Sequence, residues 1–133
     1  MDKKIKIAVI GMGYVGLPLA LEFSKYFSTI GFDVKSDRIK NLSKYIDTNS
    51  EFDSKYLKKY KKIQFTYNYK NLYLCNYYII CLPTPLFKNK KPDLRAVKNS
   101  IKMISEFIKP NDTVILESTV YPGVCEEICI PII

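Results

Sequence analysis

The sequence predicts an α/β domain built on a doubly wound parallel sheet. Apolar, strand-like runs alternate with helical patterns along all 133 residues. A glycine-rich turn follows the first run, at residues 11–16, and an acidic residue, Asp33, ends the second. Strands that alternate with helices are joined by right-handed crossovers, which make neighbouring strands parallel. The length fits a single domain, which we expect to span residues 1–133.

The first half of the chain supplies three of the expected strands. Residues 4–10 become continuously apolar toward their end, as a strand buried on both faces does. After the glycine turn, Gly16, Ala20, Phe23 and Phe27 recur at helical spacing. Two further strands are expected at residues 29–32 and 63–67, and two further helices at residues 37–46 and 50–62, the second of them rich in lysine.

The second half repeats the alternation. Residues 77–82 form a buried strand that Pro83 and Pro85 end, because proline cannot continue a hydrogen-bonded ladder. Pro92-Asp93 is a helix start signal, and apolar residues at spacings of three and four mark one buried face over residues 94–108. A fifth strand is expected at residues 113–116, and a final helical stretch follows Tyr121-Pro122-Gly123.

The last six residues form an apolar run with no polar end. Ile128, Ile130, Ile132 and Ile133 would need cover from later sequence. We therefore expect the sheet to be truncated before its last strand, and these isoleucines to be exposed and to promote self-association.

Composition excludes several kinds of protein. Hydrophobic residues make up 47% and charged residues 26%, which is ordinary for a globular domain, and no apolar run approaches the roughly 20 residues that cross a bilayer. We therefore expect a soluble cytoplasmic protein. The chain contains no histidine, which excludes Ser-His-Asp triads and histidine-based zinc sites, and no metal site is expected. The four cysteines fit no metal or disulfide pattern, so we expect reduced, mostly buried thiols at Cys75, Cys81, Cys125 and Cys129.

The net charge of +8 could attract nucleic acid, an acidic membrane surface or a phosphorylated small molecule. Arg38 and Arg95 are the only arginines, so the chain has few of the bidentate donors that read bases or phosphates. The lysine run at residues 55–62 has the pattern of a solvated helix face. We expect neither nucleic acid nor membrane as a partner.

Gly11-Met12-Gly13-Tyr14-Val15-Gly16 is a GxGxxG motif between a buried strand and a helix. In a Rossmann fold the first glycine allows the tight turn, the second lets the backbone approach a pyrophosphate, and the third lets the helix pack closely. The helix N-terminus then faces the diphosphate. Asp33 lies where a carboxylate binds the adenosine ribose and repels a 2′-phosphate. The pattern therefore predicts NAD as the cofactor, in preference to NADP.

Further motifs carry a resemblance to a known family. They are Gly31-Phe32-Asp33 with Arg38-Ile39, Cys81-Leu82-Pro83-Thr84-Pro85 with Pro92-Asp93-Leu94, and Glu117-Ser118-Thr119-Val120-Tyr121-Pro122-Gly123. Together with residues 7–20 they resemble the UDP-glucose/GDP-mannose dehydrogenase family. The last motif is most similar to its UDP-N-acetylhexosamine 6-dehydrogenase branch, which includes the Vi-polysaccharide type. The resemblance covers essentially the whole chain, but only the N-terminal cofactor domain of the family.

The resemblance implies roles for individual residues. Backbone N–H groups of the glycine turn would hold the pyrophosphate, Asp33 the adenosine ribose, and Thr84 the cofactor ribose. Arg38 would lie against the adenine side; a solvated cation at the start of a helix is the alternative. Thr119 would touch the cofactor and help to hold a water near the reacting carbon, or else only cap the next turn. The implied cofactor contacts are Gly11, Gly13, Tyr14, Val15, Gly16, Asp33, Arg38, Thr84 and Thr119, and Thr119 is the one catalytic candidate.

The chain departs from the family pattern in two loops. Leu86-Phe87-Lys88 stands where the family usually has an Asp soon after Pro-Thr-Pro, and bulkier residues at 43–46 replace a glycine usual after the second helix. The family's catalytic cysteine, linking helix and sugar-nucleotide domain match nothing here. Family members oxidise a UDP-sugar at C6 to a uronic acid for polysaccharide synthesis. By the resemblance, the UDP-sugar binds mostly through the other domain, and the full-length enzymes form homo-oligomers.

The resemblance therefore implies the NAD-binding part of a UDP-sugar 6-dehydrogenase that is inactive as this chain alone. Which nucleotide sugar it serves is left open. A stand-alone or degenerate Rossmann module that binds NAD and regulates a partner is the alternative, and turnover by the chain paired with a sugar-binding half would separate the two. A basic nucleic-acid binder would instead show salt-dependent retention on DNA.

Overall fold

The computed structural model describes residues 4–133 and shows one all-parallel sheet of five strands in the order β3-β2-β1-β4-β5. The doubly wound α/β prediction is confirmed. Each expected strand is present, and the fifth has the expected bounds. The strands are β1 (Lys6–Ile10), β2 (Ser28–Phe32), β3 (Gln64–Thr66), β4 (Tyr77–Ile80) and β5 (Thr113–Leu116).

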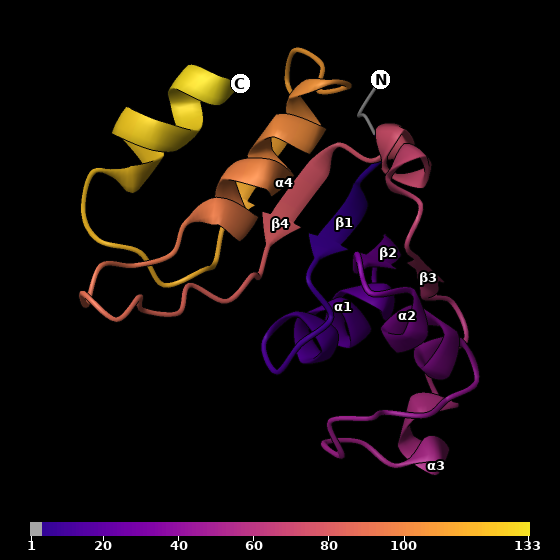
Figure 1. Ribbon diagram of the computed structural model, residues 1–133. Coiled ribbons are helices and arrows are strands. Elements are labelled where there is room, and N and C mark those ends of the chain that lie inside the picture. The colour runs from indigo at the N-terminus through magenta and orange to yellow at the C-terminus, as the bar shows by residue number, and fades with distance from the viewer. Residues whose placement is uncertain (1–3) are drawn as a thin grey trace.

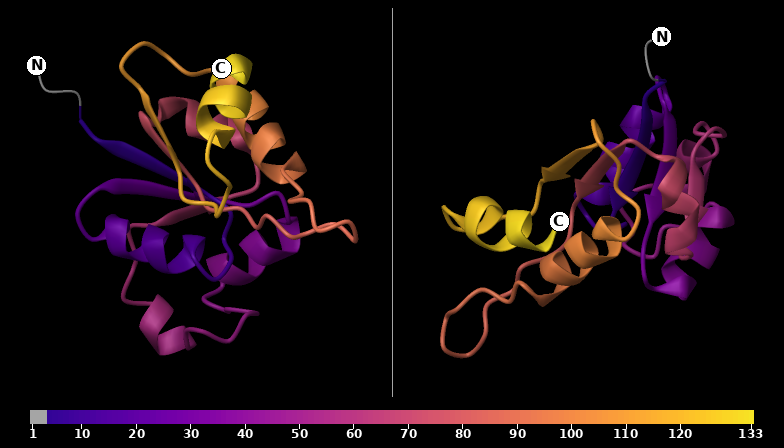
Figure 2. Two further views of the ribbon diagram at one scale, coloured as in Figure 1. Left: turned by 90° about the vertical axis from the view of Figure 1, so that its left-hand side faces the viewer. Right: turned by 90° about the horizontal axis from the view of Figure 1, so that it is seen from above.

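Helices cover both faces of the sheet (Figures 1 and 2). The left panel of Figure 2 shows α1, α2 and α3 on one side, and α4 with the C-terminal turns on the other. Within residues 4–133, no helix combines the length and apolarity needed to cross a bilayer. The helices are α1 (Gly16–Ser24), α2 (Ser36–Ser43), α3 (Ser54–Leu57) and α4 (Arg95–Ser105), with short turns η1 (Tyr69–Leu74), η2 (Cys125–Cys129) and η3 (Ile130–Ile132).

Strand β1 divides the core into two clusters. Successive side chains of a strand point to opposite faces. Ile7 and Val9 accordingly join the cluster under α1, α2 and α3, whereas Ala8 and Ile10 join the cluster under α4. All four are at most 4% exposed, which accounts for the uninterrupted apolar run of this strand.

The strand order reverses between β1 and β4. The chain leaves β1 toward β2 on one side and later returns to pair β4 with the other side of β1. The loops at the carboxyl ends of these two strands therefore diverge and leave a crevice between them. Open α/β sheets bind their ligands at such a switch point.

The lysine-rich helix expected at residues 50–62 is wrong in extent. Only Ser54–Leu57 is helical. The buried carboxylate of Asp47 accepts hydrogen bonds from the backbone of Asn49, Glu51 and Phe52, which holds the preceding segment as a loop. The closely spaced lysines that follow would repel one another along a longer helix.

The final helical stretch forms as a π-helical turn and a 3-10 turn, η2 and η3. The expected exposure of its isoleucines is wrong for two of the four. Ile128 and Ile132 pack against the cluster under α4, whereas Ile130 is 64% and Ile133 50% exposed. Ile128 and Ile132 are four positions apart, which places both side chains on the same face.

Candidate functional site

The glycine turn between β1 and α1 has a backbone that only glycine fits at two positions. Gly11 has φ of +99°, and a Cβ there would lie 2.6 Å from the carbonyl oxygen of Cys81. A Cβ on Gly16 would lie 1.7 Å from the carbonyl oxygen of Gly11. The first glycine thus permits the turn beside β4, and the third lets α1 begin directly against it.

Gly13 is different, because a Cβ there would meet no atom within 4 Å. The bare backbone at this position faces open space, where a ligand can approach closely. The adjacent N-terminus of α1 has no side-chain cap and no acidic residue in its first turn. Uncapped N–H groups and the positive end of the helix dipole make this an anion-binding position.

Asp33 connects the end of β2 to the glycine turn. Its carboxylate accepts hydrogen bonds from the backbone N–H of Met12 and of Lys35, each at 2.9 Å. Each carboxylate oxygen has a second lone pair, so both remain able to accept from a ligand hydroxyl. Asp33 borders a hollow of about 250 Å³ whose lining includes Gly11, Val34, Leu82 and Asn99.

A larger cleft of about 460 Å³ lies on the other side of Leu82. It brings together Gly13, Tyr14 and Val15 of the glycine turn with Thr84 and Thr119, the residues predicted after β4 and β5. The structure therefore divides the nine predicted residues into three groups. Gly11 and Asp33 border the smaller hollow, five residues border the larger cleft, and Gly16 and Arg38 line neither of the two.

Hydrogen bonds connect the loops after β4 and β5. The Thr84 hydroxyl donates to the carbonyl oxygen of Thr119 at 2.6 Å. The buried Ser118 hydroxyl accepts from the backbone N–H of Leu82 at 3.0 Å. These bonds span 35 and 36 positions of sequence and fix the two loops as one wall of the cleft.

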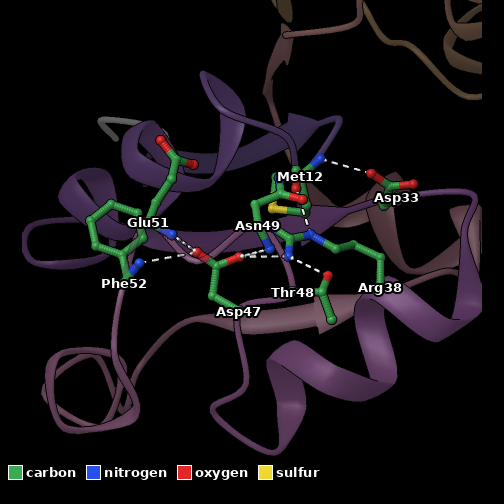
Figure 3. Close-up of polar contacts among 8 residues, drawn as sticks. All are labelled: Met12, Asp33, Arg38, Asp47, Thr48, Asn49, Glu51 and Phe52. Atoms are coloured by element: carbon green, nitrogen blue, oxygen red, sulfur yellow. Dashed lines mark hydrogen bonds and ion pairs between the residues drawn. The ribbon is translucent and has the colours of Figure 1, made fainter.

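Arg38 lies beneath the glycine turn, so the alternative of a solvated cation is wrong. Its side chain is 8% exposed, Nε donates to the carbonyl oxygen of Met12 at 2.8 Å, and Nη1 contacts Asp47 at 2.6 Å and Thr48 at 3.0 Å (Figure 3). Its buried Nη2 has no hydrogen-bond partner among residues 4–133. Arg38 thus supports the turn, and a direct contact with adenine remains a prediction.

Asn49, Glu117 and Ser118 line the larger cleft, although they are not among the site residues predicted from the sequence. Glu117 and Ser118 adjoin Thr119, so their position after β5 could have indicated them. Asn49 lies in the loop between α2 and α3, whose course depends on the burial of Asp47. Helical and strand periodicity carries no signal for a buried carboxylate in a loop.

The two departures from the family pattern have different structural outcomes. Tyr45 adopts φ of +60°, so the chain keeps a glycine-type backbone with a tyrosine at this place. Leu86-Phe87-Lys88 lies in a long loop that projects from the body (Figure 1). Leu86 and Pro92 form an isolated antiparallel β-bridge in this loop. The Arg95 guanidinium lies 5.3 Å from the centre of the Phe87 ring.

The cysteines are free thiols, and three of the four are buried. Burial raises the pKa of both Cys75 and Cys81 to about 11 and also raises the pKa of Cys129. These thiols are therefore protonated at neutral pH and are poor nucleophiles. Cys125 is exposed and does not line either hollow.

The arrangement fits a dinucleotide. Two hollows border a glycine turn whose centre faces open space, and the turn carries anion-binding N–H groups. An acceptor for ribose hydroxyls stands at the border of the smaller hollow. The larger cleft is of a size that encloses small ligands.

Known proteins resemble this chain over nearly its whole length. Residues 5–133 match the NAD binding domain of the UDP-glucose/GDP-mannose dehydrogenase family. The UDP-N-acetyl-D-glucosamine 6-dehydrogenases of Pseudomonas aeruginosa and Salmonella typhi are 44% and 42% identical to the chain, in alignments that cover 98% of it and 31% of each enzyme. The chain thus spans less than a third of the length of these relatives.

Solved structures show the same fold. GDP-mannose dehydrogenase from P. aeruginosa, in a ternary complex, superposes with a TM-score of 0.89 at 27% identity over 96% of this chain and 31% of that one. UDP-D-ManNAc dehydrogenase from Pyrococcus horikoshii gives 0.80 at 32% identity over 92% and 30%. With these matches and the geometry of the glycine turn, the chain belongs to the UDP-glucose/GDP-mannose dehydrogenase family, of which it carries the NAD-binding domain.

Proposed function

We propose that this chain is the cofactor-binding part of a nucleotide-sugar dehydrogenase that oxidises UDP-N-acetylhexosamine or UDP-glucose at C6 to the uronic acid, for polysaccharide synthesis. One observation carries the proposal. The glycine turn, Asp33 and Thr119 line two hollows that share Leu82, in a chain 44% identical to a UDP-N-acetyl-D-glucosamine 6-dehydrogenase. Residues 1–133 would form one domain of that enzyme.

The chain's own groups would hold NAD along the crevice. Backbone N–H groups of Gly13, Tyr14 and Val15 would donate to the pyrophosphate at the start of α1. Asp33 would accept from the adenosine ribose hydroxyls beside the smaller hollow. A 2′-phosphate would bring a second negative charge against this carboxylate, so NADP would bind less tightly.

Thr84 and Thr119 would act at the other end of the crevice. When bound, NAD supplies the two-electron oxidation. Thr119 lies after β5, and its hydroxyl would orient a water. The Thr84 hydroxyl holds the loop of Thr119 in place by donating to the carbonyl oxygen of Thr119. A neutral hydroxyl cannot take the alcohol proton, and the sequence offers no histidine as a base. Proton transfer and most of the sugar contacts would therefore come from the sugar-binding part of the enzyme.

The four free thiols support a reducing compartment, so we place the protein in the cytoplasm. We expect no nucleic-acid or membrane partner. Homo-oligomers are expected for the enzyme that contains both domains.

A chimera tests the proposed function. Residues 5–133 replace the matching segment of the P. aeruginosa relative, and NADH formation is followed with UDP-N-acetyl-D-glucosamine and with UDP-glucose. We expect NAD-dependent turnover, lowered by Thr119→Val. A folded chimera that binds the sugar nucleotide but forms no NADH would contradict the proposal. The chain alone, tested beside the chimera, should bind NAD but form no NADH.

A further inference from the structure

We propose that Asn49 is a binding contact for the nicotinamide half of the dinucleotide, and that the buried Arg38–Asp47 ion pair positions it. This inference rests on the proposed function, since it concerns how the same crevice holds NAD. Asn49 lines the larger cleft together with the glycine turn and Thr119, although it comes from a different part of the chain, the loop between α2 and α3.

The side chain of Asn49 is available to a ligand. It is half-buried, and its amide has no hydrogen-bond partner among residues 4–133, while its backbone N–H donates to Asp47 at 3.0 Å. An asparagine amide offers two donors and one acceptor site with two lone pairs. A half-buried amide without a protein partner, at the wall of a cleft, is placed to bond a ribose hydroxyl or a carboxamide.

The loop that carries Asn49 is anchored at Asp47. The side chain of Asp47 is fully buried, and it accepts from the backbone N–H groups of Asn49, Glu51 and Phe52. Arg38 Nη1 contacts the same carboxylate at 2.6 Å, and Nε holds the carbonyl oxygen of Met12 (Figure 3). One guanidinium therefore joins the glycine turn to the loop of Asn49, and fixes the distance between two walls of the cleft.

The position of Asn49 assigns it to one half of the ligand. Asp33 borders the smaller hollow and Asn49 borders the larger one, with Leu82 common to both. The adenosine ribose belongs with Asp33 under the proposed function. The larger cleft, which also contains Thr84 and Thr119, is then left for the nicotinamide and its ribose.

Titration calorimetry of the chain with NAD and with ADP tests the assignment, because ADP fills the adenosine half alone. Asn49→Ala should weaken NAD by about 3–10-fold, the range of one net hydrogen bond, and leave ADP within about twofold of the wild type. Asp33→Ala should weaken both ligands. Asn41→Ala is the matched control, since Asn41 is also half-buried and lines neither hollow, and it should change neither affinity.

A double-mutant cycle tests the positioning role. In an Asp47→Asn background, Asn49→Ala should cost less than about twofold in NAD affinity, because the loop no longer presents the amide. Thermal unfolding checks that each variant is folded at the binding temperature. If Asp47→Asn does not fold, Arg38→Lys replaces it, since a lysine keeps the positive charge but lacks the planar guanidinium that contacts Met12 and Asp47 together.

The outcomes separate the inference from the proposed function. Wild-type affinity of Asn49→Ala for NAD would overturn the contact and leave the proposed function standing. An equal loss for NAD and ADP would show that Asn49 acts on the fold as a whole, and full additivity in the cycle would overturn the positioning role. A wild-type chain that binds neither ligand would overturn both the inference and the proposed function.

Discussion

The carbonyl oxygen of Gly11 occupies the space into which a side chain at Gly16 would project. A Cβ built on Gly16 would lie 1.7 Å from this oxygen, and 3.2 Å from the Cβ of Cys81 on the neighbouring strand end. A backbone oxygen held between β1 and β4 cannot move aside. The GxGxxG spacing is therefore first a packing requirement of this turn, and only its middle glycine faces open space.

The glycines of the turn should separate folding from binding. Gly16→Ala should cost about 3 kcal/mol of stability or more, because the clash is with backbone. Gly13→Ala should leave stability within about 1 kcal/mol, since the new methyl group meets nothing. The same variant should weaken NAD at least roughly tenfold, about 1.4 kcal/mol, because the methyl group fills the approach of the pyrophosphate.

Urea unfolding and NAD titration of both variants check this prediction. A Gly13→Ala chain that binds NAD as the wild type does would show that the pyrophosphate lies elsewhere. A stable Gly16→Ala chain would show that the turn can open.

Asp33 should determine the choice of cofactor. Asp33→Ala should weaken NAD by about 1–3 kcal/mol, the value of a hydrogen bond to a charged group. Asp33→Asn should narrow the preference for NAD over NADP, since the charge that opposes a 2′-phosphate is gone. Calorimetry with both cofactors measures this, with Asp37→Asn as the control, an exposed carboxylate on α2. Equal affinity of the wild type for NAD and NADP would contradict the role of Asp33.

The ion pair beneath the turn should make stability depend on pH in a specific way. Burial alone would raise the pKa of Asp47, but the hydrogen bond from Arg38 and those from the backbone of Asn49 and Phe52 outweigh it and lower the pKa below 3.8. In the wild type, the stability that this carboxylate contributes is therefore complete at pH values above 3.8, the ordinary pKa of an aspartate. It is lost only as pH falls through the lowered pKa of the folded state.

Arg38→Met should reverse the sign of this dependence. The guanidinium is removed while the burial remains, so the pKa of Asp47 rises in the folded state. The variant should be about 3–5 kcal/mol less stable than the wild type at pH 7, as for a buried charge left without its partner. Protonation then relieves the cost, so the deficit should shrink as pH falls from 7 toward 4. Urea unfolding across this range measures it, and a constant deficit would mean that Asp47 does not titrate there.

The sequence predicts the strands and the glycine turn because both depend on local chemistry. Apolar runs mark β1 and β4, and Asp33 follows β2 at the spacing of a ribose-binding residue. The contacts that shape the rest of the cleft are not local. Thr84 bonds Thr119 across 35 positions, and the course of the loop after α2 depends on the burial of Asp47 against Arg38. No periodicity encodes these pairs, which is why the expected helix over residues 50–62 was too long and Asn49 was missed.

The last prediction concerns the thiols. In the native chain only Cys125 should react rapidly with a thiol reagent at pH 8, because it is exposed, whereas burial keeps Cys75, Cys81 and Cys129 protonated. Reaction with Ellman's reagent should therefore show one fast-reacting thiol per chain, four in denaturant, and no fast-reacting thiol after Cys125→Ser.

Cys81 is the most informative of the buried thiols, since it lines the larger cleft yet is 8% exposed, with its pKa raised to about 11. A buried, protonated thiol is a poor nucleophile, so Cys81 would not serve as a thiolate in the oxidation proposed above. Rapid labelling of Cys81 that NAD prevents would instead place a reactive thiol in the cofactor cleft and contradict the prediction that Cys81 is unreactive.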